Sequence, residues 1–114
     1  MGILKNILII SSLIVSQTAT AQNWTQVGSD IDGEAAEDRS GYSVSLSSDG
    51  STVAIGASFN DGNGSASGHV RIYKNINGTW TQQGADIDGE AVGDEPGWSV
   101  SLSSDGSTVA IGRY

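Results

Sequence analysis

The sequence contains a long internal repeat. Residues 24–56 recur as residues 80–112, offset by 56 positions without a gap, and 26 of the 33 aligned pairs are identical. A period of this length is typical of an array in which each copy is one supersecondary unit that buries its apolar side chains only against neighbouring copies. The repeat therefore constrains the architecture of this chain more strongly than its activity.

Residues 1–21 are predicted to be a signal peptide. Lys5 gives the segment a positively charged N-terminal region, and residues 7–15 are mostly apolar. Ala19-Thr20-Ala21 then has the small-x-small form of a signal-peptidase site. The apolar run is too short for a spanning helix, which needs about 20 apolar residues, so the alternative of a membrane anchor is disfavoured. We therefore expect a secreted or cell-surface protein whose mature chain begins at Gln22.

The predicted mature chain is strongly acidic. It carries 4 basic and 13 acidic residues, a net charge of −9. Such a surface repels nucleic acid, and it leaves divalent cations as candidate counterions. Cysteine is absent from the sequence, so sheet packing rather than disulfides must stabilise the fold.

The first repeat predicts a β-hairpin. Bulky and small side chains alternate over residues 42–47, which is the period of a strand with two different faces. Asp49-Gly50 follows, a dipeptide typical of a two-residue type I′ turn, and residues 52–57 resume an apolar strand.

This turn predicts the register and therefore the two faces of the hairpin. Leu46 should lie opposite Val53 and Val44 opposite Ile55, while Ser45 faces Ala54 and Ser43 faces Gly56. One face is then aliphatic and the other small. We expect the aliphatic face to be buried, with the large side chains of one unit filling the space over the small residues of the next, as in propeller blades or a sandwich.

Two further strands are predicted to complete the unit. Alternation over residues 69–74 gives a third strand, and Asn75-Ile76-Asn77-Gly78 signals a second hairpin leading into residues 79–83. An even-length turn there places Tyr73 and Trp80 on one face. The segments 58–67 and 86–96 are predicted to be surface loops.

These residues resemble the FG-GAP repeat that builds the β-propeller of integrin α-subunits and many secreted bacterial proteins. The resemblance runs from Trp24 to the end and rests on three segments of this sequence. They are Gly41-Tyr42-Ser43-Val44-Ser45, Val53-Ala54-Ile55-Gly56-Ala57-Ser58 and Gly68-His69-Val70-Arg71-Ile72-Tyr73. The resemblance implies an all-β fold of antiparallel four-stranded propeller blades; the alternative is a small β-sandwich. It implies adhesion, ligand-binding or structural roles rather than one activity.

The predicted organisation is about one and a half blades, a fragment of a longer array. After the signal peptide, residues 22–40 are expected to hold the outer strand of a preceding blade, near Trp24, and an acidic connector. Residues 41–84 form a complete blade, and residues 85–114 form a connector and a truncated second blade. Open faces and edges on such a fragment favour self-association.

Calcium is the only cofactor that the sequence suggests, and only at the acidic loops. Family blades that bind calcium carry a long acidic loop between their first two strands, whereas here that connection is Ser48-Asp49-Gly50-Ser51. Calcium takes 6–8 oxygen ligands, so Asp49 and Asp105 are expected to be turn formers. The better candidates are Asp30-Ile31-Asp32-Gly33-Glu34, Asp86-Ile87-Asp88-Gly89-Glu90 and Asp61-Gly62-Asn63, for which a solvated loop is the competing interpretation.

No catalytic constellation is predicted, and the chain is expected not to be an enzyme. His69 is the only histidine and is interpreted as a half-exposed strand residue. Asp30 and Asp32 recur as Asp86 and Asp88, which favours a structural loop over a glycosidase pair, because one active site needs no copy in each repeat. No catalytic, cofactor-binding or metal residues are assigned.

The sequence is most consistent with a non-catalytic module for adhesion or for interaction with an extracellular protein or glycan. One alternative is a carbohydrate-binding or hydrolase-associated appendage, for which Phe59 is the candidate stacking aromatic. The other alternative is a purely structural spacer between domains.

Overall fold

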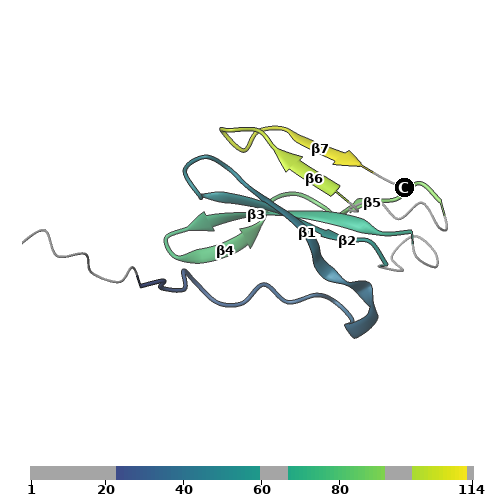
Figure 1. The fold of residues 1–114 in the computed structure, drawn as a ribbon, viewed down its shortest axis with the longest axis horizontal. Helices are drawn as coiled ribbons and strands as arrows, with labels where there is room; N and C mark the ends of the chain where they lie inside the picture. The colour runs from purple at the N-terminus through teal and green to yellow at the C-terminus, as the bar shows by residue number, and fades with distance from the viewer. Residues whose placement is uncertain (1–22, 60–66, 92–98, 113–114) are drawn as a thin grey trace, which may run out of the picture.

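The computed structural model describes residues 23–59, 67–91 and 99–112 (Figure 1). The predicted signal peptide and the candidate loop Asp61-Gly62-Asn63 lie outside these residues. No helix in the described part of the chain is long and apolar enough to cross a membrane.

The main sheet is antiparallel and takes its strands in chain order. Its path runs β1-β2-β3-β4, and a short β5 pairs with β3 on the same side as β4. The strand bounds are β1 Ser40–Leu46, β2 Thr52–Ala57, β3 His69–Ile76, β4 Thr79–Gln82 and β5 Ile87–Asp88. A separate two-stranded sheet comprises β6 Ser99–Leu102 and β7 Val109–Gly112. The predicted all-β antiparallel fold is confirmed, and it is consistent with propeller blades.

The predicted register of the first hairpin is confirmed. Val44 pairs with Ile55 and Leu46 with Val53, while Ser45 pairs with Ala54. The second repeat reproduces this register, because Val100 pairs with Ile111 and Leu102 with Val109. The two hairpins thus have the same bulky face and the same small face.

The predicted type I′ turn at Asp49-Gly50 is wrong. Ser47 and Thr52 are still bonded across the hairpin, with Ser47 N–H donating to Thr52 O at 2.9 Å, so the loop has four residues. Gly50 has φ +74°, but Asp49 is not among the residues with positive φ. The type I′ conformation occurs instead at Asn77-Gly78, where both φ values are positive, 52° and 86°.

The prediction that the bulky face of the first hairpin is buried is also wrong. Tyr42, Val44 and Leu46 are 45%, 62% and 58% exposed, whereas Ala54 on the small face is fully buried. The bulky face is exposed because the second hairpin packs on the small face of the first. This leaves the bulky side chains of β1 open to solvent.

The second hairpin stacks on the first as predicted for neighbouring repeats, with large side chains of one unit over small residues of the other. β6 contacts both β1 and β2, and Leu102 N–H donates to Ser45 Oγ at 2.9 Å. At the turn, a Cβ on Gly106 would come within 2.9 Å of the Thr52 side chain. The side chains of Val100 and Leu102 are half-buried, and those of Ser99 and Ser101 are exposed. The bulky face of the second repeat therefore lies over the small face of the first.

The segment before the sheet is not a strand. Residues 23–39 contain no strand and only a 3-10 turn at Ala36–Asp38, so the predicted outer strand near Trp24 is wrong. Trp80, the repeat equivalent of Trp24, lies in β4 because β3 supplies its backbone partners at Asn75. No such partner faces residues 23–27 among the described residues. Residues 23–34, which we call the N-terminal strap, instead lie along the opposite side of the sheet from β6 and β7 (Figure 1).

Candidate functional site

The N-terminal strap covers a row of functional side chains on β3. His69, Arg71 and Tyr73 alternate along the strand and therefore share one face of the sheet. Trp80 on β4 lies on the same face, because it pairs with Asn75. This confirms the prediction that Tyr73 and Trp80 share a face. Trp80 Nε1 donates to Val27 O at 2.8 Å, which fixes the strap over the outer strands.

Arg71 is the centre of a charged cluster. Its Nε donates to Asp86 Oδ1 at 3.1 Å. Its Nη2 forms an ion pair with Glu34 Oε1 of the strap. The Arg71 side chain is 16% exposed, so solvent screens these pairs less than it screens surface pairs. The cluster joins the strap, β3 and the segment after β4.

A bulge in the edge strand places Asp86 in this cluster. Gln83 N–H donates to Ile72 O, and Ile87 then pairs with Val70, so three residues of the edge strand lie opposite Arg71 alone. Bulges re-aim side chains in this way. The pairing of β5 also corrects the prediction that the whole of residues 86–96 is a loop, because Ile87–Asp88 extends the edge of the sheet.

Asp86 is held in its ionised form. Partial burial raises the pKa of its carboxyl group, but the hydrogen bonds from Gln82 and Arg71 and the nearby charge of Arg71 together outweigh that effect and hold the pKa below its usual value. Gln82 Nε2 donates to Asp86 Oδ1 at 2.6 Å. The same contact occurs in the first repeat copy, where Gln26 Nε2 donates to Asp30 Oδ1 at 2.8 Å.

His69 is buried, which corrects the interpretation of a half-exposed strand residue. Its side chain is 3% exposed, because β2 pairs with it on one side at Ala57 and β5 on the other at Asp88. Its Nδ1 forms no hydrogen bond among the described residues. This nitrogen faces Asp86 Oδ2 at 3.5 Å.

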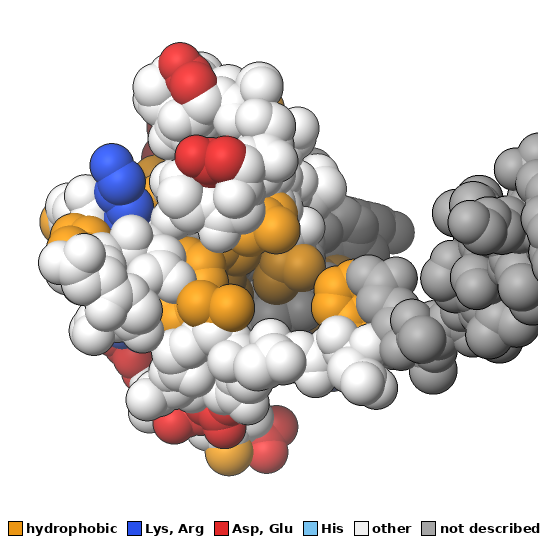
Figure 2. All heavy atoms as spheres, turned by 90° about the vertical axis from the view of Figure 1, so that its left-hand side faces the viewer, with side chains coloured by type: hydrophobic (Ala, Val, Ile, Leu, Met, Phe, Trp, Pro, Cys, Tyr) orange, Lys and Arg blue, Asp and Glu red, His pale blue; other side chains and the backbone are white. Residues whose placement is uncertain are grey.

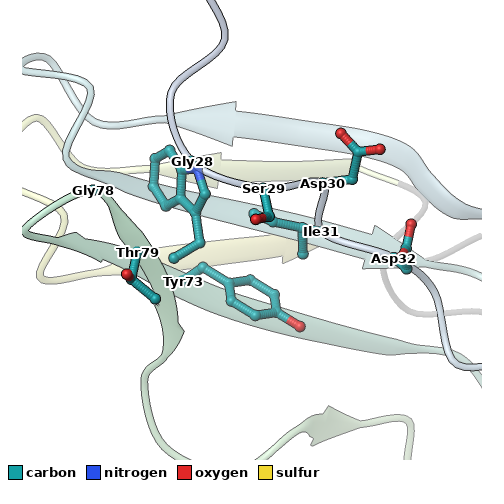
Figure 3. A pocket seen from close by; sticks show the side chains of 9 residues that line it. Gly28, Ser29, Asp30, Ile31, Asp32, Tyr73, Gly78 and Thr79 are labelled. Atoms are coloured by element: carbon teal, nitrogen blue, oxygen red, sulfur yellow. The ribbon is translucent and has the colours of Figure 1, made fainter.

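A pocket lies beside the cluster, between the strap and the outer hairpin. Its volume is about 300 Å³. Figure 3 shows the ring of Tyr73 on one side of the pocket and the strap residues across from it. Arg71 Nη1 donates to the Tyr73 hydroxyl at 3.3 Å, which links the pocket to the charged cluster. The lining residues are Gly28, Ser29, Asp30, Ile31, Asp32, Tyr73, Gly78, Thr79 and Trp80.

The other predicted candidates, Asp49, Asp105 and Phe59, have structural partners of their own in the fold. Asp49 accepts hydrogen bonds from Ser47 Oγ, Ser51 N and Ser51 Oγ, and Asp105 has the equivalent partners in the second copy. Both are turn formers, as predicted. The Phe59 ring has the Arg39 guanidinium 4.2 Å from its centroid, so that face is already covered.

Sequence reasoning missed Glu34, Arg71 and Asp86 as a group. The two acidic loops were recognised, and the structure brings together one carboxylate from each of them, Glu34 and Asp86. The available signal was Arg71, which lies between the apolar residues Val70 and Ile72 of β3, since a charge on the covered face of a strand requires a partner.

The comparisons with known proteins agree with this architecture. The family model of the FG-GAP repeat matches residues 24–73, which span the strap, the first hairpin and most of β3. No curated protein and no solved structure was found to match the chain. Residues 24–73 therefore match the FG-GAP repeat, and the all-β, antiparallel fold of the chain is consistent with an FG-GAP-like repeat protein.

Proposed function

We propose that the chain is a non-catalytic interaction module of a secreted or cell-surface protein, and that it binds a partner protein through the bulky face of β1 and β2. The observation that carries this proposal is the exposure of Tyr42, Val44 and Leu46 on that face. Figure 2 shows hydrophobic side chains gathered in a hollow, with acidic side chains above and below it. Contiguous apolar surface rimmed by polar groups is typical of a protein-binding site.

The chain itself indicates what kind of surface fits this face. The equivalent bulky face of the second repeat lies over a sheet face of small side chains, those of Ser45, Thr52 and Ala54. The second hairpin leaves its own small face exposed at Ser99 and Ser101. A partner that offers a similar small-residue sheet face, including a second copy of this chain, is complementary to the bulky face of β1 and β2.

Sedimentation velocity over a concentration series tests this proposal, with the chain as its own partner. The wild-type sedimentation coefficient is expected to rise with concentration, and Val44→Ser/Leu46→Ser is expected to remove that rise. Ile76→Ser is the control, because Ile76 is 47% exposed but lies on the other side of the sheet. A double variant that associates as the wild type does would refute the assigned face.

Export is a separate part of the proposal and has its own test. The predicted cleavage between Ala21 and Gln22 lies outside the described residues and is supported by the sequence pattern. Intact-mass measurement on protein exported by a bacterial host should give a chain beginning at Gln22. An exported chain that retains residues 1–21 would count against this route.

Glycan binding is a second candidate function, favoured by the pocket rather than by Phe59. Tyr73 and Trp80 supply aromatic surface, while Asp30 and Asp32 supply hydrogen-bond acceptors in the same cavity. A glycan array probed with the wild type and with Asp32→Ala tests it. Binding that depends on Asp32 supports the pocket as the site, and an array with no binding removes this candidate.

A further inference from the structure

Three metal-ligand atoms converge beneath the strap, from three separate segments. Glu34 comes from the strap, His69 from the start of β3, and Asp86 from the bulge before β5. One carboxylate oxygen of each acid and one nitrogen of the histidine all lie within 4.8 Å of one another. The repeat supplies only the acids, because His69 has no second copy in the chain.

The distances between these three ligand atoms suit a small divalent ion. Ligands at 2.0–2.2 Å from a tetrahedral zinc ion are about 3.4 Å apart. His69 Nδ1 and Asp86 Oδ2 already lie at 3.5 Å. Glu34 is 45% exposed, and its carboxylate oxygen lies within 4.8 Å of both other ligand atoms.

His69 provides independent support for a ligand at this point. It is 3% exposed, and its Nδ1 has no hydrogen-bond partner among the described residues. The 3.5 Å separation from Asp86 Oδ2 is longer than a normal N–H···O hydrogen bond. A buried polar atom without a partner costs free energy, which a bound ion would recover.

Neighbouring side chains hold Asp86 in the required orientation. Arg71 Nε and Gln82 Nε2 both donate to Asp86 Oδ1, which leaves Oδ2 directed at His69. Hydrogen bonds of this kind orient the ligands of metal sites. Arg71 contributes one positive charge against the two negative charges of Glu34 and Asp86, so the cluster keeps a net negative charge that favours a cation.

We propose that Glu34, His69 and Asp86 bind a Zn²⁺ ion, with the fourth position open to water or to a partner's side chain. Histidine nitrogen and carboxylate oxygen are both zinc ligands, and zinc sites with three protein ligands keep the fourth position open. Calcium requires 6–8 oxygen ligands, and this cluster offers a nitrogen and two carboxylates. The proposed ion would pin the strap to the sheet, and it goes beyond the protein-binding face proposed above.

Titration of the purified chain with ZnCl₂ in a calorimeter tests the proposal, and CoCl₂ reports the geometry through its visible absorption. We expect one zinc ion per chain and the intense absorption of tetrahedral cobalt. Glu34→Gln and Asp86→Asn should each weaken zinc binding by at least about tenfold. Glu90→Gln is the matched control, because Glu90 is the equivalent of Glu34 in the second repeat copy, and it should leave the zinc affinity unchanged.

Circular dichroism of each variant separates loss of binding from loss of folding. If Asp86→Asn unfolds the chain, the more exposed Glu34 decides, since its replacement by Gln removes one carboxylate ligand at a side chain that is 45% exposed. Zinc affinity equal to wild type in Glu34→Gln, or equally reduced in Glu90→Gln, would overturn the assigned site. No zinc binding, or binding of CaCl₂ in preference to ZnCl₂, would also overturn it.

Discussion

The indole N–H of Trp80 donates a hydrogen bond to the carbonyl oxygen of Val27, 2.8 Å away and 53 residues earlier in the chain. This bond and the Arg71–Glu34 ion pair attach the two ends of the N-terminal strap to the outer strands. Gly28 lies between them, so close to Trp80 that a Cβ there would approach its ring to 2.9 Å. The strap is therefore packed against β4 and is part of the folded unit.

Replacing Trp80 with Phe should weaken this attachment. An aromatic ring is kept, but the N–H and part of the indole's packing are lost, so the free energy of unfolding should fall by at least about 1 kcal/mol. Trp24 is its equivalent in the first copy and is 91% exposed, so Trp24→Phe should change stability by less than about 0.5 kcal/mol. Urea unfolding of both variants gives the comparison, and equal effects would show that the strap is not held by this bond.

The two faces of the first hairpin should respond very differently to charge. Ala54 is fully buried under the second hairpin, so Ala54→Asp places an unpaired charge there and should cost at least about 3 kcal/mol. Val44 is 62% exposed, so Val44→Asp should cost about 1 kcal/mol or less. Thermal unfolding of the two variants tests the assignment. A larger loss for Val44→Asp would reverse the faces.

The hairpin turns should loosen in acid. Hydrogen bonds from the side chain and backbone of Ser107, and from Ser103, lower the pKa of Asp105 from 3.8 to about 2. Because the folded-state pKa is depressed, the stabilisation is complete above pH 3.8 and is lost as the pH falls from there towards 2. Asp49 has its pKa lowered by the equivalent bonds from Ser51 and Ser47.

An NMR titration of the Asp105 side-chain carboxyl carbon measures this effect directly. The midpoint should lie near pH 2. Ser107→Ala removes one donor and should move the midpoint upwards, while Ser51→Ala acts on Asp49 and should leave the Asp105 midpoint unchanged. A wild-type midpoint near 3.8 would mean that these hydrogen bonds are absent in solution.

The sequence predicted the strand pairing better than it predicted burial. The register around Val44 and Leu46 was correct although the turn type was wrong, because two-residue and four-residue loops centred between Asp49 and Gly50 give the same pairing. The alternation of bulky and small residues defines the two faces of the hairpin, but it does not determine which face a neighbouring repeat covers. Here the neighbour lies on the small face, where Ser45 meets Leu102.

The charged cluster depends on contacts between residues far apart in the chain, and local patterns do not encode these. Glu34 and Arg71 are 37 positions apart, and Asp86 reaches Arg71 only because a bulge interrupts the edge strand. Alternation alone predicts a half-exposed His69, because it gives no information about β5, which covers this residue in the structure. The sequence shows that the two loops are rich in acidic residues. Only the folded structure shows that one carboxylate from each loop lies close to the other.

The proposed binding face depends on one contact, the stacking of the second hairpin on the small face of the first. Gly50 and Gly106 are equivalent turn residues, both with φ +74°, so alanine should cost about 1 kcal/mol of backbone strain at either position. A Cβ at Gly106 would also meet the Thr52 side chain at 2.9 Å, whereas at Gly50 its nearest neighbour is Leu46 Cδ2 at 3.9 Å.

The difference between the unfolding free energies of Gly50→Ala and Gly106→Ala, measured by urea denaturation, therefore tests the stacking most directly. Gly106→Ala should be the less stable variant by about 1–3 kcal/mol, because its methyl group overpacks the contact between the repeats. Equal stabilities of the two variants would contradict the stacking of the second repeat on the first.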